Sequence, residues 1–187
     1  MFGSIAKFTA EITDPARAGE VMLRALQAAT SGVPGPVVIA VPEDVLAELT
    51  PAPTVRPQAP AVAGPDRGAV TELRRLLTAA ERPLVIAGSG IGKPGEREQL
   101  LAFLEAWELP AVVSFRRHDL LPNSHRLYMG DMGLSNPTSQ MDVLHRADLV
   151  VVLGARLGDI TTQNYTFPHP VRPAQTLLHV HADPAAI

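Results

Sequence analysis

Short apolar runs alternate with amphipathic stretches over most of residues 66–187. A short run rich in Val, Ile and Leu is typical of a strand that is buried on both faces. Apolar positions recur at helical spacing in the stretches between the runs, over residues 66–80, 95–108 and 137–146. The predicted strands are Leu84–Ala87, Ala111–Ser114, Leu149–Leu153 and Thr176–His181. Strands that alternate with helices predict an α/β fold with a parallel sheet and right-handed crossovers.

Two segments of this region show neither pattern. Residues 115–136 contain prolines, glycines and asparagines without a regular period, and residues 155–175 are similarly mixed. We expect both segments to be irregular loops.

Residues 1–50 predict one further helix and strand. Asp14 is a good N-cap and Pro15 suits the first helical position, so a helix is expected from there to about Gly32. The strand is expected at Val37–Val41. One helix cannot cover both faces of a strand, so this piece is expected to belong to a larger sheet or to pack against the rest of the chain.

Prolines concentrate in residues 51–65, which separate the two pieces. Proline fixes φ and removes a backbone donor, so this stretch is predicted to be an extended, semi-rigid linker. The predicted organisation is therefore 1–50, a linker at 51–65, and a main domain at 66–187.

Charge and composition exclude several partners. The net charge is −3 and no basic stripe is visible, so we expect no nucleic-acid partner. No apolar run has the length of about 18 residues that a membrane span needs, so we expect no membrane partner. Cysteine is absent, which excludes disulfides and thiolate chemistry and leads us to expect a cytoplasmic protein.

The main candidate site is the turn after Leu84–Ala87, with the sequence Gly88-Ser89-Gly90-Ile91-Gly92. Glycines let the backbone turn tightly, and free N–H groups at the start of the next helix can bind a phosphate. The alternative is a tight turn that the fold alone requires. The strand ends at Gly88, Ser114 and Gly154 are predicted to line one crevice, where ligands of open α/β sheets bind.

Arginines follow two of these strand ends. Arg116 and Arg117 follow Ser114, and Arg156 follows Gly154. A guanidinium there can pair with a phosphate, or it can pair with a carboxylate of this chain such as Asp131 or Asp159.

The last strand carries His179, His181 and Asp183 on one face. This spacing is compatible with a metal site and leaves a metal-dependent hydrolase as an alternative function. The spacing resembles the His-x-His-x-Asp motif of metallohydrolases, in which another histidine follows the aspartate. Pro184 stands at that position here, so no metal site is predicted.

The ordered motifs resemble those of thiamine-diphosphate enzymes of the acetolactate synthase and benzoylformate decarboxylase type. They are listed here in chain order: Gly35-Pro-Val-Val-Ile-Ala-Val-Pro-Glu-Asp-Val45, Arg82–Gly92, Leu109–Val113, Gly130-Asp-Met-Gly133, Ala147–Arg156 and His181-Ala-Asp-Pro184.

The resemblance implies an architecture for the whole chain. Residues 1–50 are similar to the tail of a pyrimidine-binding domain. Residues 66–187 are similar to the central domain, which in that family is a Rossmann-like parallel sheet of six strands with helices on both faces. The family's catalytic glutamate and its diphosphate- and magnesium-binding motif have no match here. We therefore expect a non-catalytic fragment of a thiamine-diphosphate-dependent 2-oxo-acid decarboxylase or carboligase that scaffolds the missing catalytic domains, in a parent enzyme that is a homo-oligomer.

The resemblance also implies a cofactor site, because some relatives bind FAD or ADP in the central domain. The positions expected to bind it are Gly88, Ser89, Gly90, Arg116, Gly130, Gly133, Gly154, Arg156 and Asp183. Thiamine diphosphate and Mg²⁺ are expected only in the parent enzyme. A free-standing nucleotide-binding regulatory module is the other function left open.

Overall fold

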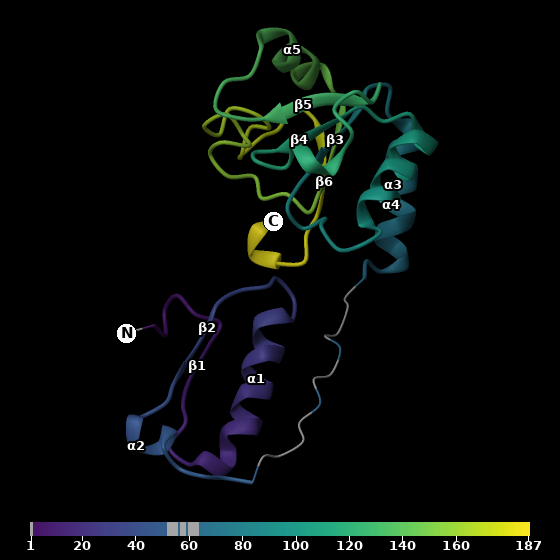
Figure 1. The fold of residues 1–187 in the computed structure, drawn as a ribbon. Coiled ribbons are helices and arrows are strands. Elements are labelled where there is room, and N and C mark those ends of the chain that lie inside the picture. Colours follow the sequence, from purple (N-terminus) through teal and green to yellow (C-terminus); the bar gives the residue numbers. More distant parts are fainter. Residues whose placement is uncertain (1, 52–55, 57–58, 60–63) are drawn as a thin grey trace. The chain divides into compact units, whose positions relative to one another are not determined.

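The structure is a computed structural model that describes residues 2–51, 56, 59 and 64–187. It divides into two compact units, Met1–Gly64 and Pro65–Ile187 (Figure 1). The predicted linker at 51–65 lies largely outside the described residues.

The first unit is a single β-α-β element with a short extra helix. Its elements are β1 (Phe8–Glu11), a 3₁₀ turn (Pro15–Arg17), α1 (Ala18–Thr30), β2 (Val37–Ala40) and α2 (Glu43–Leu46). As the sequence predicts, the carboxylate of Asp14 caps the helical segment by accepting the Ala16 N–H at 2.9 Å. The prediction missed β1, because Phe-Thr-Ala-Glu is short and mixed, and β2 ends one residue earlier than predicted.

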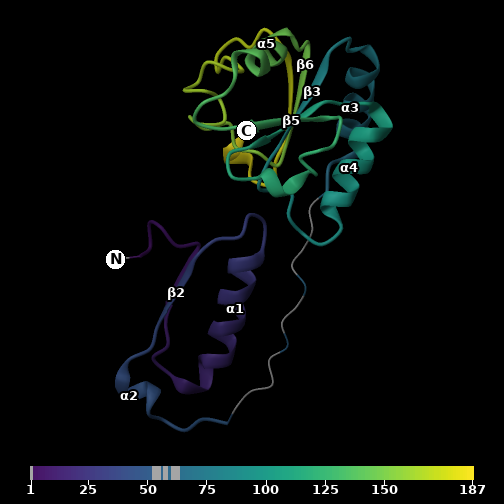
Figure 2. The same ribbon diagram turned by 45° about the horizontal axis from the view of Figure 1, so that its top comes forward.

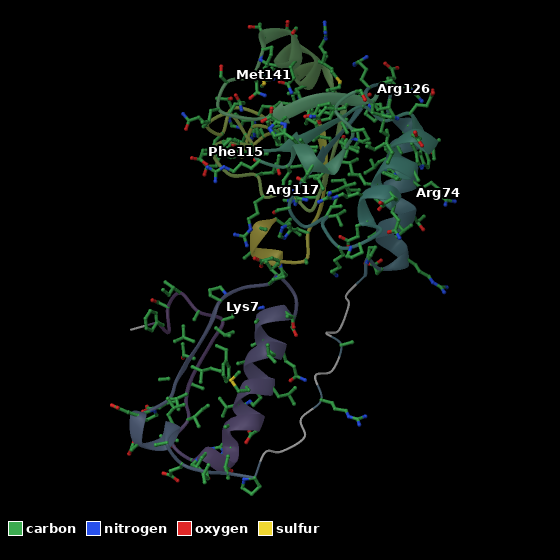
Figure 3. The ribbon with its side chains drawn as sticks, in the orientation of Figure 1. Lys7, Arg74, Phe115, Arg117, Arg126 and Met141 are labelled. Carbon is green, nitrogen blue, oxygen red and sulfur yellow. The ribbon has the colours of Figure 1, made fainter. Side chains whose placement is uncertain are left out.

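In this unit β1 and β2 run parallel, with Phe8 opposite Val37. A small core forms around Ile12, Val21 and Val45. The ammonium group of Lys7, labelled in Figure 3, donates to the carbonyls of Ser31 and Val33 at 2.6 and 2.8 Å and so ties β1 to the segment after α1.

The second unit is an open sheet of parallel strands in the order β5-β4-β3-β6-β7. Its elements are α3 (Arg67–Ala79), β3 (Pro83–Ala87), α4 (Glu96–Trp107), β4 (Ala111–Ser114), β5 (Tyr128–Met132), α5 (Thr138–Arg146), β6 (Leu149–Leu153) and β7 (Thr176–Val180). This confirms the predicted α/β class and parallel sheet.

The sheet has five strands, so the expected number of six was wrong for the described residues. The prediction of an irregular segment at 115–136 was also wrong in part, because β5 lies within it. Tyr-Met-Gly-Asp-Met has weak strand propensity, and Gly130 has a φ of +100°. The pairing with β4 shifts register between Ala111 and Val113, so β5 is an irregular edge strand that a search for apolar runs does not detect.

Helices cover both faces of this sheet, in agreement with the prediction. Alternate residues of β3 point to opposite sides, so Val85 and Ala87 pack with α3 and α4, while Leu84 and Ile86 pack with α5 and Phe167. Figure 2 shows α3 and α4 on one side of the strands and α5 on the other.

A search of the described helices found none with both the length and the apolar character needed to cross a bilayer.

Candidate functional site

The carboxyl ends of β4, β3 and β6 are neighbours in the sheet, as the sequence predicts. The chain passes from β3 outward to β4 and β5 and then returns to the other side of β3 as β6, so the boundary between β3 and β6 is the topological switch point. The turns that follow these two strands are joined by their backbones. The Gly88 N–H donates to the Leu153 carbonyl at 2.9 Å, and the Gly90 N–H donates to the Gly154 carbonyl at 2.7 Å.

The glycines are needed for this close approach. A Cβ atom at Gly90 would lie 2.8 Å from the Gly154 Cα, and one at Gly88 would overlap the backbone of Ala155. Gly154 also has a φ of +62°, which disfavours other residues. The glycine turn after β3 therefore packs against the turn after β6.

Every backbone N–H of the turn from Gly90 to Lys93 has a partner within the chain. Gly90 donates to Gly154, as described, and Ile91 donates to the Gly88 carbonyl at 3.1 Å. The N–H groups of Gly92 and Lys93 both donate to one carboxylate oxygen of Glu96, at 2.8 Å each. Pro94 has no N–H to offer.

These two hydrogen bonds place a carboxylate where the sequence suggested a phosphate. The hydrogen bonds from Gly92 and then Lys93 lower the pKa of the Glu96 carboxyl below its ordinary value, so the group remains ionised in mild acid. The sequence analysis missed Glu96. The only signal for Glu96 in the sequence was an acidic residue at the start of a predicted helix, where a carboxylate is favourable.

Arg117, rather than Arg116, reaches the glycine turn. Its guanidinium donates to the Ile91 carbonyl at 2.8 Å and to Asp119 at 3.0 Å. Arg97 of α4 also pairs with Asp119, and the hydrogen bond from Arg117 is the main cause that lowers the pKa of that carboxyl. Figure 3 labels Arg117 and Phe115, which lie in the segment after β4.

Arg116 is exposed and has a φ of +64°. Its guanidinium lies 5.0 Å from the centre of the Phe115 ring. This cation–π contact is local, so the side chain does not join the glycine turn.

Arg156 and Asp183, both predicted to bind a cofactor, form an ion pair with each other at 3.1 Å. Asp183 also accepts the Ala185 N–H at 3.0 Å and so caps the final 3₁₀ turn. The pair therefore ties the segment after β6 to the segment after β7.

Gly130 lies in β5 and lines a separate pocket of about 530 Å³ between β5 and the start of α5, and Gly133 directly follows β5. The buried amide of Gln140, which the sequence analysis missed, donates to the carbonyls of Met129 and Asp131 at 3.0 and 3.1 Å. Gln163 donates to the Gly133 carbonyl at 2.8 Å. Among the described residues, no hydrogen bond or ion pair joins these glycines to Gly88, Gly90 and Gly154 or to the Arg156–Asp183 pair.

A second pocket of about 430 Å³ lies between α4 and the segment after β4. Arg97, His118 and Asp119 line it together with apolar side chains such as Leu101 and Leu121. Asp119 bonds Arg97 and Arg117, whereas Glu98 also lines the pocket, and most of the wall surface is apolar.

His179 lies in β7 and His181 follows its last residue, and the two imidazoles contact different backbone groups. The Nε2 of His179 lies 2.8 Å from the Ala155 carbonyl, while the Nδ1 of His181 accepts the Asp183 N–H at 3.0 Å. Within the part of the chain that the structure describes, no group of three or more His, Cys, Asp or Glu side chains could hold a metal.

The site as a whole is suited to holding the sheet together. The predicted positions form one backbone cluster, made by Gly88, Gly90 and Gly154, and one ion pair, made by Arg156 and Asp183. The backbone N–H groups from Gly90 to Lys93 are all in use, so a nucleotide pyrophosphate cannot bind the Gly92 and Lys93 N–H groups unless Glu96 moves.

Comparisons with known proteins place the chain in a family. Residues 70–187 match the family described as "Thiamine pyrophosphate enzyme, central domain". The chain is 32% identical to the acetolactate synthase isozyme 3 large subunit of Escherichia coli (strain K12), over 90% of this chain and 30% of that protein. It is 30% identical to the acetolactate synthase large subunit of Corynebacterium glutamicum, over 98% of this chain and 29% of that protein.

A solved structure agrees with these sequence matches. The crystal structure of benzoylformate decarboxylase from Polynucleobacter necessarius superimposes with a TM-score of 0.77 and 27% identity, over 97% of this chain and 34% of that one. The chain spans about a third of the length of these relatives. By its sequence and its fold, the chain belongs to the thiamine pyrophosphate enzyme family, and its residues 70–187 are the central domain of that family.

Proposed function

We propose that this chain is the non-catalytic, scaffolding part of a thiamine-diphosphate-dependent 2-oxo-acid decarboxylase or carboligase. Residues 66–187 would be its central domain, and residues 1–50 the tail of its pyrimidine-binding domain. One observation carries the proposal: the polar groups at the switch point of the sheet are bonded to one another. The turn after β3 bonds the turn after β6 and Glu96, and Arg156 bonds Asp183.

In such an enzyme, bound thiamine diphosphate supplies a nucleophilic carbon that adds to the keto group and an electron sink for the electrons released on decarboxylation. We expect the residues that bind it, and Mg²⁺, to lie outside this chain, because the family's motifs for them have no match in this sequence. Gly130-Asp131-Met132 does not replace them, because the third residue of the family's Gly-Asp-Gly motif is Met here. This chain would position the catalytic domains without touching the reacting atoms.

The exposed apolar side chains of the first unit support this assignment. Ile5, Met22 and Leu26 are 70%, 47% and 48% exposed. Parallel strands are normally covered on both faces, and α1 covers only one face of β1 and β2. We propose that the remaining strands of a pyrimidine-binding domain cover this surface, in a cytoplasmic enzyme that forms homo-oligomers.

The test compares the 187-residue chain with a full-length acetolactate synthase. Both are assayed for CO₂ release from pyruvate with thiamine diphosphate and Mg²⁺, and for heat of coenzyme binding by calorimetry. We expect turnover and binding only for the full-length enzyme. Turnover by the chain alone would overturn the proposal. Sequencing of the neighbouring coding region gives an independent check, since a continuation into a Gly-Asp-Gly segment is expected.

A further inference from the structure

We infer that the Glu96 carboxylate excludes a nucleotide pyrophosphate from the turn after β3, so that this turn fastens α4 to the sheet instead of binding FAD or ADP. The inference concerns this turn alone and goes beyond the scaffolding role proposed above.

The first step is the match between the Glu96 carboxylate and the anion that it replaces. A phosphate at a helix start binds through adjacent backbone N–H groups and through the positive end of the helix dipole. Glu96 binds in a similar way. One of its oxygens accepts both the Gly92 and the Lys93 N–H at 2.8 Å, and Glu96 itself is the first residue of α4. Hydrogen bonds to an ionised acceptor are roughly twice as strong as neutral ones.

The second step is that the internal carboxylate has an advantage over any ligand from solution. Glu96 is tethered three and four residues from its donors, so it binds them without the loss of translational and rotational freedom that association costs. A pyrophosphate that approached the turn would also meet a like charge at contact distance. The lowered pKa of Glu96 keeps that charge in place through mild acid.

The third step is that other hydrogen-bond donors near the turn are also bonded within the chain. The Gly90 and Ile91 N–H groups donate to Gly154 and Gly88. The Arg117 guanidinium contacts the turn directly, because it donates to the Ile91 carbonyl, and it also donates to Asp119. These N–H groups and the Arg117 guanidinium are therefore already bonded to groups of the chain.

The test follows the Gly92 and Lys93 amide resonances of the 187-residue chain during titration with inorganic pyrophosphate, ADP and FAD. The variants are E96A, which removes the carboxylate, and E98A. Glu98 is exposed and lies in the same helical turn, so E98A removes one equal charge and keeps the two hydrogen bonds. E96Q keeps a neutral hydrogen-bond acceptor without the charge, so its affinity for pyrophosphate should lie between those of the wild type and E96A.

We expect no amide shift in the wild type or E98A up to millimolar pyrophosphate. E96A should gain affinity for pyrophosphate by about tenfold to a hundredfold, the range for removing a competitor held by charge-assisted hydrogen bonds. The E96Q gain should be smaller. The inference is overturned if ADP or pyrophosphate shifts these amides in the wild type, or if E96A and E98A behave alike.

If E96A fails to fold, the wild-type and E96Q titrations still decide the question. The readout uses neither thiamine diphosphate nor turnover, so a failure of the proposed parent enzyme would leave this result unchanged.

Discussion

The two units of the molecule use the same β-α-β element but bury it to different extents. In the second unit, β3 has a strand on each side and helices on both faces, and Val85, Ile86 and Ala87 are fully buried. In the first unit, no residue of β1 or β2 is buried. A parallel strand reaches full burial only with two covered faces, so the second unit has the burial of a layered sheet and the first unit leaves its strands partly exposed.

The largest expected effect is a matched pair of core truncations. Ile86→Ala in β3 removes a fully buried side chain, and Ile39→Ala in β2 removes a partly exposed one. We expect Ile86→Ala to lower the free energy of unfolding of the second unit by about 2–5 kcal/mol. Ile39→Ala should cost about 1 kcal/mol, because the Ile39 side chain buries less apolar surface on folding than the Ile86 side chain does. Urea unfolding followed by circular dichroism measures both, and equal losses would contradict the contrast between the units.

A second prediction concerns the backbone contact at the switch point. Gly90→Ala places a Cβ atom 2.8 Å from the Gly154 Cα, so the two turns must move apart. We expect a loss of about 1–3 kcal/mol, the usual cost of overpacking. Gly158→Ala is the matched control, because a Cβ there meets no atom within 4 Å. A neutral Gly90→Ala would show that the contact between the turns does not stabilise the sheet.

A third prediction tests an acid-sensitive clamp between the start of β3 and the start of β6. The Asp148 carboxylate accepts the N–H groups of Glu81 and Arg82 at 2.7 and 2.9 Å. Burial alone would raise the pKa of Asp148, but these hydrogen bonds outweigh burial and lower it. A lowered pKa in the folded state stabilises the protein above the unfolded value of about 3.9, and this stabilisation disappears as pH falls through the folded pKa.

Asp148→Asn should therefore cost about 1–2 kcal/mol at neutral pH, the net value of hydrogen bonds to a charged group. The difference from the wild type should shrink toward zero in acid. Asp142→Asn, at an exposed position of α5, is the control and should leave the pH dependence unchanged. Thermal unfolding across a pH series measures these curves, and a loss for Asp148→Asn that did not vary with pH would exclude the clamp.

The smallest effect is expected on the surface of the first unit. Glu20 on α1 pairs with Arg17 and Arg24 at 3.3 and 3.4 Å, and the Glu20 side chain is 52% exposed. The hydrogen bond and charge of Arg17 lower the pKa of Glu20, yet solvent screens such pairs. Glu20→Gln should leave the melting temperature within error, and a clear drop would show that the first unit depends on its surface charges.

The sequence predicts the parts of the fold that depend on local apolar pattern. The buried strands β3, β4 and β6 are apolar at every position except Ser114, so their positions could be predicted within a residue or so. The edge strand β5 contains Gly130 in a positive-φ conformation and the polar Asp131, and its strand conformation depends on pairing with β4. A pattern search cannot detect a strand that tertiary pairing alone creates.

The candidate site was less predictable for a geometric reason. The alternating glycines correctly indicated a close backbone approach, but the identity of the approaching group, the Gly154 turn, depends on sheet order. Arg117 rather than Arg116 reaches the turn, and the positive φ of Arg116 in that segment is a backbone feature that the sequence pattern does not indicate. The Glu96 hydrogen bonds depend on how Gly95, with a φ of +84°, starts α4.

The clamp formed by Asp148 also has a consequence for how the protein is made. Asp148 bonds Glu81, which lies 67 positions earlier in the chain, and β6 follows directly after Asp148. At a synthesis rate of about 5–20 residues per second, an emerging β3 spends several seconds without one of its two neighbouring strands. During translation the buried strand β3 thus has one open edge, and this edge closes only when β6 has been synthesised.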